Sequence, residues 1–368
     1  MLSGFKASVQ NELDAFFAHL INQSDLLRKV SAQAFSKARQ HFSADAFTLL
    51  NASWQTLVEE HFPTPRWLGL RVVAADASKM SLFLNDATAR KVQEAMAFAL
   101  YLPASEMTLS ARLYGSSCGE RQMLFEHLDL LRPDDLLVLD RGYPASWLIA
   151  VLVQRAQHFC MRVDALGFSV VRAFLRSNQD EMIVEIAAPT AQDALAYECV
   201  AKPSRVRLIR VVTPNGRVHA LMTSLLDAKA FPAESFGALY HGRWRIEEAF
   251  KRLKHRLALE NTSGLSWLAA QQDVGAKILA DNLHAVAILA AQEENPLPLE
   301  YKINRTYAFA LLKRCLPRWL LSDTPTPPLL KDALCLLTQQ LIRFIPLASK
   351  PRPQRPKPHR KHADKSVY

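Results

Sequence analysis

The segment Tyr240–Leu257, with the sequence YHGRWRIEEAFKRLKHRL, constrains the fold of this chain more than any other. Successive residues of an α-helix lie about 100° apart, so the segment drawn as a helix divides into two adjacent stripes. One stripe is apolar and wide enough to pack on a core, and consists of Ile246, Ala249, Phe250, Leu253 and Leu257. The other is polar, and consists of Tyr240, Arg243, Glu247, Lys251 and Lys254. We expect a helix that buries the first stripe and presents the second.

The polar stripe has two interpretations. Glu and Lys residues at helical spacing often form salt-bridged, solvated surfaces, so the stripe alone is compatible with an ordinary exposed face. It is also compatible with a site in which one carboxylate, Glu247, is bracketed by cations. Glu248 points about a quarter-turn away and is outside the stripe. The choice depends on whether other segments supply partners for Glu247.

Two apolar segments predict strands that each lead to an aspartate. Leu68–Ala75 (LGLRVVAA) is rich in β-branched residues and is followed by Asp76. Asp135–Leu139 (DLLVL) is a short, continuous apolar run, typical of a buried strand, and is followed by Asp140. After Asp76, the residues ASK predict a short turn, with Met80–Leu84 returning as a hairpin partner.

These two aspartates and Glu247 are a suitable donor set for divalent cations. Mg²⁺ prefers oxygen ligands and keeps positions open for phosphate and water. Two such ions about 3.5–4 Å apart stabilise the attacking and leaving oxygens of a phosphoryl displacement. Taken singly, each acid also has an ordinary explanation, because Asp is common in turns.

Composition favours a polyanionic partner. The chain has 368 residues, 49% of them hydrophobic, and a formal net charge of +10, with a pI near 9.4. Nucleic acid is the first candidate for such a basic protein. Residues 350–368 carry seven Lys or Arg against one Asp, with several prolines and no apolar periodicity. We expect this tail to be disordered.

The cysteines and apolar segments predict an intracellular location. No C-x-x-C pair occurs and the number of cysteines is odd, which favours neither a disulfide framework nor a zinc knuckle; they are Cys118, Cys160, Cys199, Cys315 and Cys335. The N-terminus has no signal-peptide pattern. No uncharged apolar run reaches the roughly 18 residues of a membrane span. We expect a cytoplasmic protein without a membrane partner.

The spacing Tyr-x2-Arg-x3-Glu-x6-Lys in the segment Tyr240–Leu257 resembles the YREK signature of bacterial transposases of the insertion-sequence-four type. The same family has a first aspartate after a strand, matched by VVAADAS, and a second in an Asp-x-Gly-aromatic motif, matched by DRGY at 140–143. The resemblance covers roughly residues 30–280. It implies an α/β fold, with a ribonuclease-H-like catalytic core of a mixed sheet flanked by helices.

The resemblance also implies roles for individual residues. Asp76, Asp140 and Glu247 would be both the catalytic residues and the metal ligands of two Mg²⁺ ions, for which Mn²⁺ can substitute. Tyr240, Arg243 and Lys254 would contact phosphates of the transposon end, and Lys251 lies on the same stripe. The partners would be double-stranded DNA, as terminal inverted repeats and as target, and a second copy of the chain in a synaptic complex. Such a protein would be associated with the bacterial nucleoid when bound to DNA.

Six regions are expected along the chain. The 106 residues between Asp140 and Glu247 exceed a simple strand–helix crossover, and the strand-like segments FSVVRAFL, MIVEIA, RVRLIRVV and VHALMTSL predict a β-rich insertion there. The regions are a helical N-terminal region 1–66, the first part of the core 67–164, the β insertion 165–225, the second part of the core 226–292, C-terminal helices 293–346 and a basic disordered tail 347–368. For the N-terminal region, binding of DNA ends and a plain helical cap both remain open.

The chain departs from the family pattern in two places. Ala77 follows the first aspartate, where the family often has glycine, so a small residue is retained. Some family members stack a flipped base on a tryptophan of the insertion while forming a DNA hairpin, but no Trp lies between Trp147 and Trp244. Either the hairpin route is absent, or another aromatic residue replaces the tryptophan; the candidates are Phe168, Phe174 and Tyr197.

Other functional classes fit less well. A catalytically inactive, DNA-binding regulator would be expected to lack an acid, whereas all three are present. A tyrosine recombinase using Tyr240 would need a dispersed Arg/His cluster ahead of a C-terminal tyrosine, but Tyr240 begins the helix that carries Glu247. An RNA-binding module would need RNP or KH motifs, which the sequence lacks.

Removing residues 350–368 is expected to weaken nonspecific DNA binding without eliminating catalysis. Lysines and arginines that neutralise phosphates release counterions, so the truncated chain should show a shallower dependence of log K on log salt concentration. Fluorescence anisotropy with a random duplex at several salt concentrations measures this slope. An unchanged slope would contradict a role of the tail in DNA binding.

Overall fold

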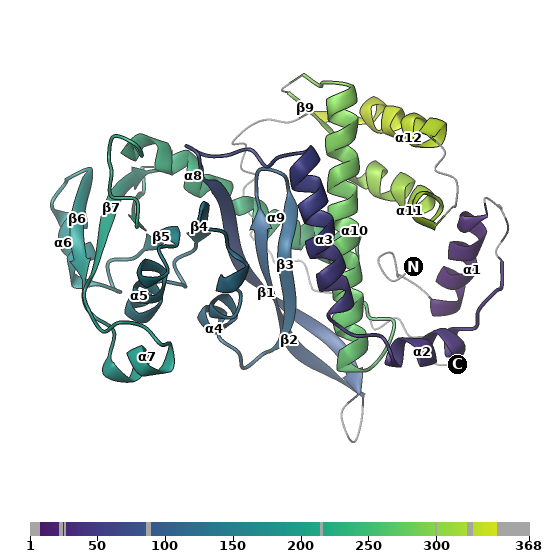
Figure 1. Ribbon diagram of the computed structural model, residues 1–368, viewed down its shortest axis with the longest axis horizontal. Coiled ribbons are helices and arrows are strands. Elements are labelled where there is room, and N and C mark those ends of the chain that lie inside the picture. Colours follow the sequence, from purple (N-terminus) through teal and green to yellow (C-terminus); the bar gives the residue numbers. More distant parts are fainter. Residues whose placement is uncertain are drawn as a thin grey trace. The chain divides into compact units, whose positions relative to one another are not determined.

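A mixed eight-stranded sheet is the main element of the described chain, with the strand order β3-β2-β1-β4-β5-β8-β7-β6 (Figure 1). The computed structural model describes residues 8–21, 25, 27–85, 90–213, 216–298, 300–321 and 327–343. By its contacts the chain divides into two units. The core unit is Glu59–Met80 with Glu94–Lys251, and the helical unit is Met1–Val58, Ser81–Gln93 and Arg252–Tyr368. The expected basic tail lies outside the described residues.

The strands of the sheet have the following bounds: β1 Arg71–Asn85, β2 Arg90–Leu102, β3 Met107–Gly115, β4 Asp135–Leu139, β5 His158–Val163, β6 Glu181–Ile186, β7 Ser204–Val212 and β8 Val218–Thr223. β1, β4 and β5 are parallel neighbours. β2 pairs antiparallel with β3, and β5, β8, β7 and β6 pair antiparallel in turn. The predicted mixed sheet of an α/β fold is confirmed.

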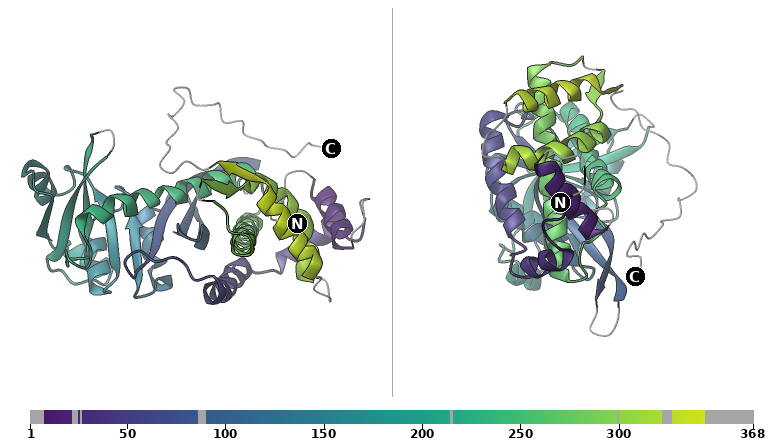
Figure 2. Two further views of the ribbon diagram at one scale, coloured as in Figure 1. Left: turned by 90° about the horizontal axis from the view of Figure 1, so that it is seen from above. Right: turned by 90° about the vertical axis from the view of Figure 1, so that its right-hand side faces the viewer.

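The helices follow in chain order: α1 Val9–Leu20, α2 Ala32–Gln40, α3 Ala46–His61, α4 Glu120–Phe125, α5 Ser146–Gln154, α6 Ser169–Arg176, α7 Ala191–Ala196, α8 Phe236–Gly242, α9 Trp244–Arg256, α10 Trp267–Glu294, α11 Arg305–Leu321 and α12 Pro327–Gln339. Short 3-10 turns η2 (Leu128–Leu130) and η3 (Ala233–Ser235) precede β4 and α8, and a small antiparallel pair joins β9 (Tyr301–Ile303) to β10 (Leu341–Arg343). Figure 2 gives two further views of these elements.

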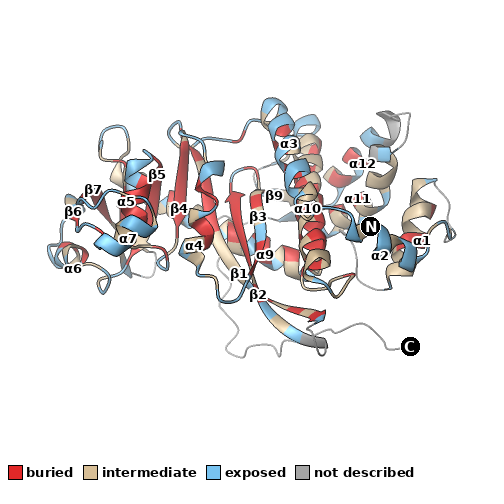
Figure 3. Cartoon of the chain, turned by 60° about the horizontal axis from the view of Figure 1, so that its bottom comes forward, coloured by how far each residue is buried: buried red, intermediate tan, exposed pale blue. Residues whose placement is uncertain are grey.

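β4 shows why the sheet is covered on both faces. All five of its residues are buried, and they are drawn in red in Figure 3. Leu137 and Leu139 belong to a core cluster that includes residues of α4, α5 and α6. Leu136 and Val138 belong to a second cluster that includes residues of α8. Alternate residues of a strand point to opposite faces, so the continuous apolar run DLLVL requires two apolar layers.

The predicted β-rich insertion adds strands to the same sheet. β6, β7 and β8 follow β5 at one edge, and Val206 and Met222 join the same core cluster as β4. One expected strand is wrong, because FSVVRAFL forms the helix α6. Val171 and Phe174, three residues apart, are its buried residues, so the spacing is helical rather than alternating.

The expected hairpin after Asp76 is also wrong. β1 continues without a turn through residues 76–79 to Asn85, so Asp76 lies inside a long strand and not at its end. Met80, Leu82 and Leu84 are buried and alternate with more exposed residues, which is the pattern of an extended strand. The polar residues of the ASK segment mark the partly exposed middle of this strand.

A buried ion pair joins the first residues of β1 and β4. The Arg71 guanidinium donates through Nε to Asp135 Oδ1 at 2.6 Å and through Nη2 to Oδ2 at 2.8 Å. The two side chains are 2% and 0% exposed. Asp135 Oδ2 also accepts from the backbone amide of Arg132 at 2.8 Å. A buried charge is strongly destabilising without its partner, so this pair favours one register of β1 against β4.

The long helix α10 is the core helix of the helical unit. It is long and apolar enough to cross a membrane by length and composition alone, but 61% of its most apolar window is buried within the protein. Its buried face also carries polar and charged residues, namely Gln272, Asp273, Lys277, Asp281, Asn282 and His284. These make internal contacts; for example, Lys277 Nζ donates to the carbonyl oxygen of Ala258 at 2.7 Å.

The C-terminal region, expected to be helical over 293–346, also contains a pair of short strands. Residues 301–303 form β9, which pairs with β10. Pro317 lies inside α11, which continues through it to Leu321. Ile303, Leu312 and Leu337 share one apolar cluster with α10, and this packing offsets local preferences.

Replacing Asp135 by alanine is expected to destabilise the protein by about 3–5 kcal/mol, because Arg71 would remain buried without a partner. The matched control is the neighbouring Asp134, whose ion pair with Arg66 is 40–42% exposed; Asp134→Ala should cost less than about 1 kcal/mol. Urea unfolding measures both. Equal losses would show that the buried pair has no special role.

Candidate active site

The register between β1 and β4 places the first two predicted acids side by side. Arg71 pairs with Asp135 and Ala74 with Val138, a constant offset of 64 positions. The same offset, continued along both strands, pairs Asp76 with Asp140. Val72 and Asp76 are an even number of residues apart, so the Asp76 side chain shares a strand face with Val72, which packs against the cluster that includes α8.

The loop after β4 holds the second acid. Asp140 Oδ1 accepts a hydrogen bond from the backbone N–H of Gly142 at 2.7 Å. A Cβ atom at residue 142 would lie 3.1 Å from the same oxygen, which is closer than an ordinary contact. This explains the glycine of the DRGY motif in physical terms. Arg121 of α4 fixes the loop further, since its Nε donates to the carbonyl oxygens of Gly142 and Tyr143, both at 3.0 Å.

The third acid, Glu247, lies in the helical segment Tyr240–Leu257. The predicted apolar stripe is confirmed: Ile246, Ala249, Phe250, Leu253 and Leu257 are all buried. Glu248 is exposed, whereas the Glu247 side chain is 26% exposed. Helix α8 ends at Gly242 and α9 begins at Trp244, with Arg243 between them in a helical conformation. The Arg243 and Glu247 side chains of the polar stripe are therefore more buried than the residues of an ordinary solvated helical face.

Electrostatics indicate that the three carboxylates are near one another. The pKa of Asp76 is raised to about 7, mainly by burial. The Arg243 guanidinium lowers it, while the negative charges of Asp140, Glu247 and Glu120 each raise it. Such charge effects operate at short range between partly buried groups. The structure thus brings Asp76, Asp140 and Glu247 into one charged cluster.

Arg243 is the cation within this cluster. Its Nη2 donates to Glu247 Oε1 at 3.0 Å, and its side chain is only 7% exposed. The guanidinium also lies over the ring of Tyr240, with Cζ 5.7 Å from the ring centroid. Burial raises the pKa of Tyr240 to about 12, the chief effect opposing it being Arg243. A tyrosine so reluctant to ionise is a poor nucleophile, which disfavours the recombinase alternative.

The two lysines of the stripe differ in surroundings. Lys251 is exposed and belongs to the core unit. Lys254 belongs to the helical unit, and its Nζ lies 4.0 Å from Glu260 Oε1. Burial lowers the pKa of Lys254, and Glu260 raises it.

The donor set suits divalent cations, although the side chains are not closed around one position. Within the described ranges, no three His, Cys, Asp or Glu side chains are grouped closely enough to hold a single ion. Two observations still favour binding. Carboxylate oxygens are the ligands that Mg²⁺ prefers, and the Tyr143 hydroxyl beside the cluster is buried with no hydrogen-bond partner among the described residues. Asp76, Asp140 and Glu247 would hold the ions, with Glu247 leaving Arg243.

Comparison with known families decides the assignment. The family of the transposase DDE domain matches residues 67–283, more than half of the chain. This range contains all three acids and the whole YREK spacing. The chain belongs to this family.

A named relative agrees with this assignment. The chain is 24% identical over 255 residues to the transposase InsG for insertion sequence element IS4 from Escherichia coli (strain K12), which confirms the predicted resemblance to the insertion-sequence-four type. The match covers 65% of this chain and 57% of that protein. A solved structure, the piggyBac transposase synaptic complex with hairpin DNA, is similar over 85% of this chain and 66% of that chain, with 11% identity and a TM-score of 0.44.

Sequence reasoning missed one carboxylate beside the site. Glu120, the first residue of α4, has a raised pKa because of burial and then of the negative charge of Asp140. No motif marks this residue. The sequence places Glu120 only near the start of a short helix. That position does not reveal that the Glu120 side chain approaches the loop after β4.

The candidate substitutes for a base-stacking tryptophan differ in exposure. Phe174 is fully buried in the core. Tyr197 is partly exposed and stacks on Trp147, with ring centroids 3.6 Å apart and an angle of 5° between the planes. Phe168 is also partly exposed and packs against the same core.

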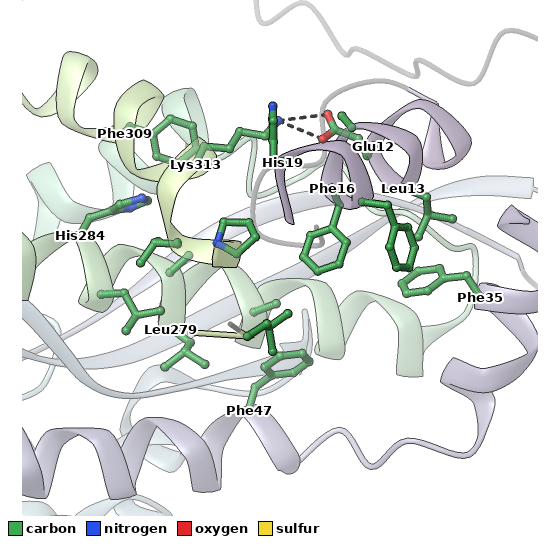
Figure 4. A pocket seen from close by; sticks show the side chains of 18 of the residues that line it. Glu12, Leu13, Phe16, His19, Phe35, Phe47, Leu279, His284, Phe309 and Lys313 are labelled. Carbon is green, nitrogen blue, oxygen red and sulfur yellow. Dashed lines mark hydrogen bonds and ion pairs between the residues drawn. The ribbon is translucent and has the colours of Figure 1, made fainter. Parts of the chain in front are cut away.

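A cavity lies in the helical unit of the chain. It has a volume of about 470 Å³ and is lined mostly by apolar side chains, among them Phe16, Phe47, Leu279 and Phe309 (Figure 4). Lys313 Nζ and Glu12 Oε2 form an ion pair at 2.9 Å beside it. The cavity has no cluster of carboxylates, so it lacks the chemistry for phosphoryl transfer.

The raised pKa of Asp76 predicts a pH effect on the metal-free protein. A carboxyl group whose pKa rises on folding stabilises the native state below its unfolded pKa, near 4, and this contribution is lost as the pH rises through about 7. The slope from one proton is at most about 1.4 kcal/mol per pH unit. Asp76→Asn should remove this slope in urea unfolding with EDTA, whereas the exposed control Glu248→Gln should retain it. Identical pH profiles of wild type and Asp76→Asn would contradict the raised pKa of Asp76.

Proposed function

We propose that this protein is a DNA transposase that cleaves the ends of a transposon and joins the freed 3′-hydroxyl to target DNA. The observation that carries the proposal is the convergence of Asp76, Asp140 and Glu247 on one cluster within a transposase DDE domain. The chain spans 57% of the length of its relative InsG, so the activity of that whole protein is inferred for this chain from the site and not from the name.

The acids of the site act through charge and position. Two bound Mg²⁺ ions, or Mn²⁺ in their place, supply neutralisation of phosphate charge and activation of water or a 3′-hydroxyl. Asp76, whose pKa is raised by the charges of both other acids, would hold the ions together with Asp140 and Glu247. Phosphoryl transfer depends mainly on positioning and on electrostatic stabilisation, which this arrangement of carboxylates and cations provides.

The polar stripe of α8 and α9 is assigned to the DNA backbone. Arg243 is paired with Glu247 in the metal-free chain and would be available to a phosphate oxygen at the same place if Glu247 served as a metal ligand. Tyr240 holds that guanidinium over its ring. Lys254 and the exposed Lys251 continue the stripe and are assigned to phosphates farther along the strand.

The substrate is double-stranded DNA that carries terminal inverted repeats, followed by target DNA. An element has two ends and each chain has one candidate site, so we propose a homodimer in the synaptic complex. A formal charge of +10 suits a polyanionic partner. Action on chromosomal DNA would place the protein in the bacterial cytoplasm, at the nucleoid when DNA is bound.

Alanine at Asp76, Asp140 or Glu247 is expected to reduce cleavage by at least about a hundredfold, the scale for losing one group that stabilises transition-state charge. Binding to DNA ends should persist, because the cations remain. The substrate is a duplex taken from the DNA flanking the gene, where inverted repeats bounded by short direct duplications identify the ends.

Glu248→Ala is the matched control for this experiment, since Glu248 is adjacent to Glu247 but exposed. It should retain nearly full cleavage. Retained cleavage in any of the three acid variants would overturn the assignment. A wild-type protein that binds the ends but does not cleave them would indicate the regulator instead.

A further inference from the structure

Glu120 faces the same position as Asp140. A Cβ atom built on Gly142 would lie 3.1 Å from Asp140 Oδ1 and 3.7 Å from Glu120 Oε2. Both carboxylate oxygens therefore lie close to the position that a Cβ atom at residue 142 would occupy. The distance between the two oxygens cannot exceed the sum of these two distances. Glu120 approaches from α4, whereas Asp140 follows β4, so two separate elements direct acids to this point.

Nearby arginines do not explain this placement of Glu120. The next residue, Arg121, uses its guanidinium on backbone carbonyl oxygens at 142–144. The guanidinium of Arg243 is bonded to Glu247. Glu120 adds a negative charge to a cluster that already contains Asp76 and Asp140, and this arrangement is unfavourable unless a cation is bound.

The Tyr143 hydroxyl is an independent sign of a ligand at this place. The Tyr143 side chain is fully buried, and its Oη has no hydrogen-bond partner among the described residues. The charges that act most on this hydroxyl are those of Glu120, Asp76 and Asp140, so it lies beside the acids. A buried hydroxyl without a partner costs about 1–3 kcal/mol. A bound phosphate or water oxygen would accept a hydrogen bond from this hydroxyl.

Formal charge favours a fourth acid. Asp76, Asp140, Glu247 and Glu120 together carry four negative charges when ionised, which equals the charge of two divalent cations. In the metal-free cluster, Arg243 supplies only one positive charge. With all four acids committed to metal ions, Arg243 keeps its charge for the DNA backbone.

We propose that Glu120 is a fourth metal-ligating carboxylate of this active site, acting beside Asp140, and that the Tyr143 hydroxyl is a positioning group that donates to an oxygen bound there. This inference rests on the proposed transposase function, because it assigns ligands to the metal ions of the same site.

The test is isothermal titration of Mn²⁺ into the metal-free full-length protein. Glu120→Gln should weaken Mn²⁺ binding about 10–100-fold, the range for loss of a group that supports a metal site. Glu120→Asp, which keeps a shorter carboxylate, should recover part of the affinity, and the exposed control Glu248→Gln should bind as wild type does. Unchanged Mn²⁺ affinity in Glu120→Gln would overturn the proposal.

Thermal unfolding provides a readout that a purely structural role would not produce. Without metal, Glu120→Gln should be at least as stable as wild type, because a like charge is removed from the cluster. The Mn²⁺-induced rise in Tm should be smaller than in wild type, because the added stability follows the affinity. A loss of metal-free stability with a full Mn²⁺-induced rise would show that Glu120 is merely structural.

Two further variants separate the possible failures. If Asp76→Asn abolishes Mn²⁺ binding and Glu120→Gln does not, the role of Glu120 is refuted while the proposed function stands. If Asp76→Asn also binds Mn²⁺ as wild type does, the proposed function itself fails. Tyr143→Phe should preserve folding and lower the cleavage rate about 10–100-fold, less than or similar to the loss of an oxyanion donor. An unchanged cleavage rate would refute the role of the hydroxyl.

Discussion

The buried pair between Arg71 and Asp135 is the constraint on which the site depends. It lies at the first residues of two parallel strands, with both side chains almost completely buried. A slip of one residue would separate these charges and also turn Asp76 to the opposite face of the sheet. The acids of the proposed active site, Asp76 in β1 and Asp140 directly after β4, are each five residues farther along the chain, so this contact also aligns them.

Sequence patterns predicted the elements whose chemistry is local. The run DLLVL indicated a buried strand, and the 3.6-residue spacing of Ile246, Phe250 and Leu253 indicated the packed face of a helix; both are observed. The path after Asp76 was not predictable in this way. A polar segment within a strand resembles a turn until its neighbouring strands are known, because sheet pairing is non-local. The helix α6 was missed because a short apolar run has no unambiguous period.

The site was predicted in part. The three acids were found because they lie in motifs with fixed spacing, and the structure places them in one charged cluster. Glu120 has no such spacing, and its approach to Gly142 depends on how α4 packs beside the loop after β4. The burial of Arg243 was likewise hidden, since a helical stripe drawn from sequence does not distinguish solvent from the edge of a sheet. Arg243 contacts Glu247 in the structure, and contact with DNA remains a proposal.

The contact between Arg243 and Glu247 has a consequence for the protein when no metal ion is bound. In a cluster of acids alone, the carboxylates would repel one another whenever divalent cations are scarce, and this repulsion would destabilise the surrounding strands. Arg243, between α8 and α9, supplies a positive charge that is covalently part of the chain and lies 3.0 Å from Glu247. Under the proposed function, this guanidinium would balance part of the acid charge in the metal-free protein and would be available to DNA once ions are bound.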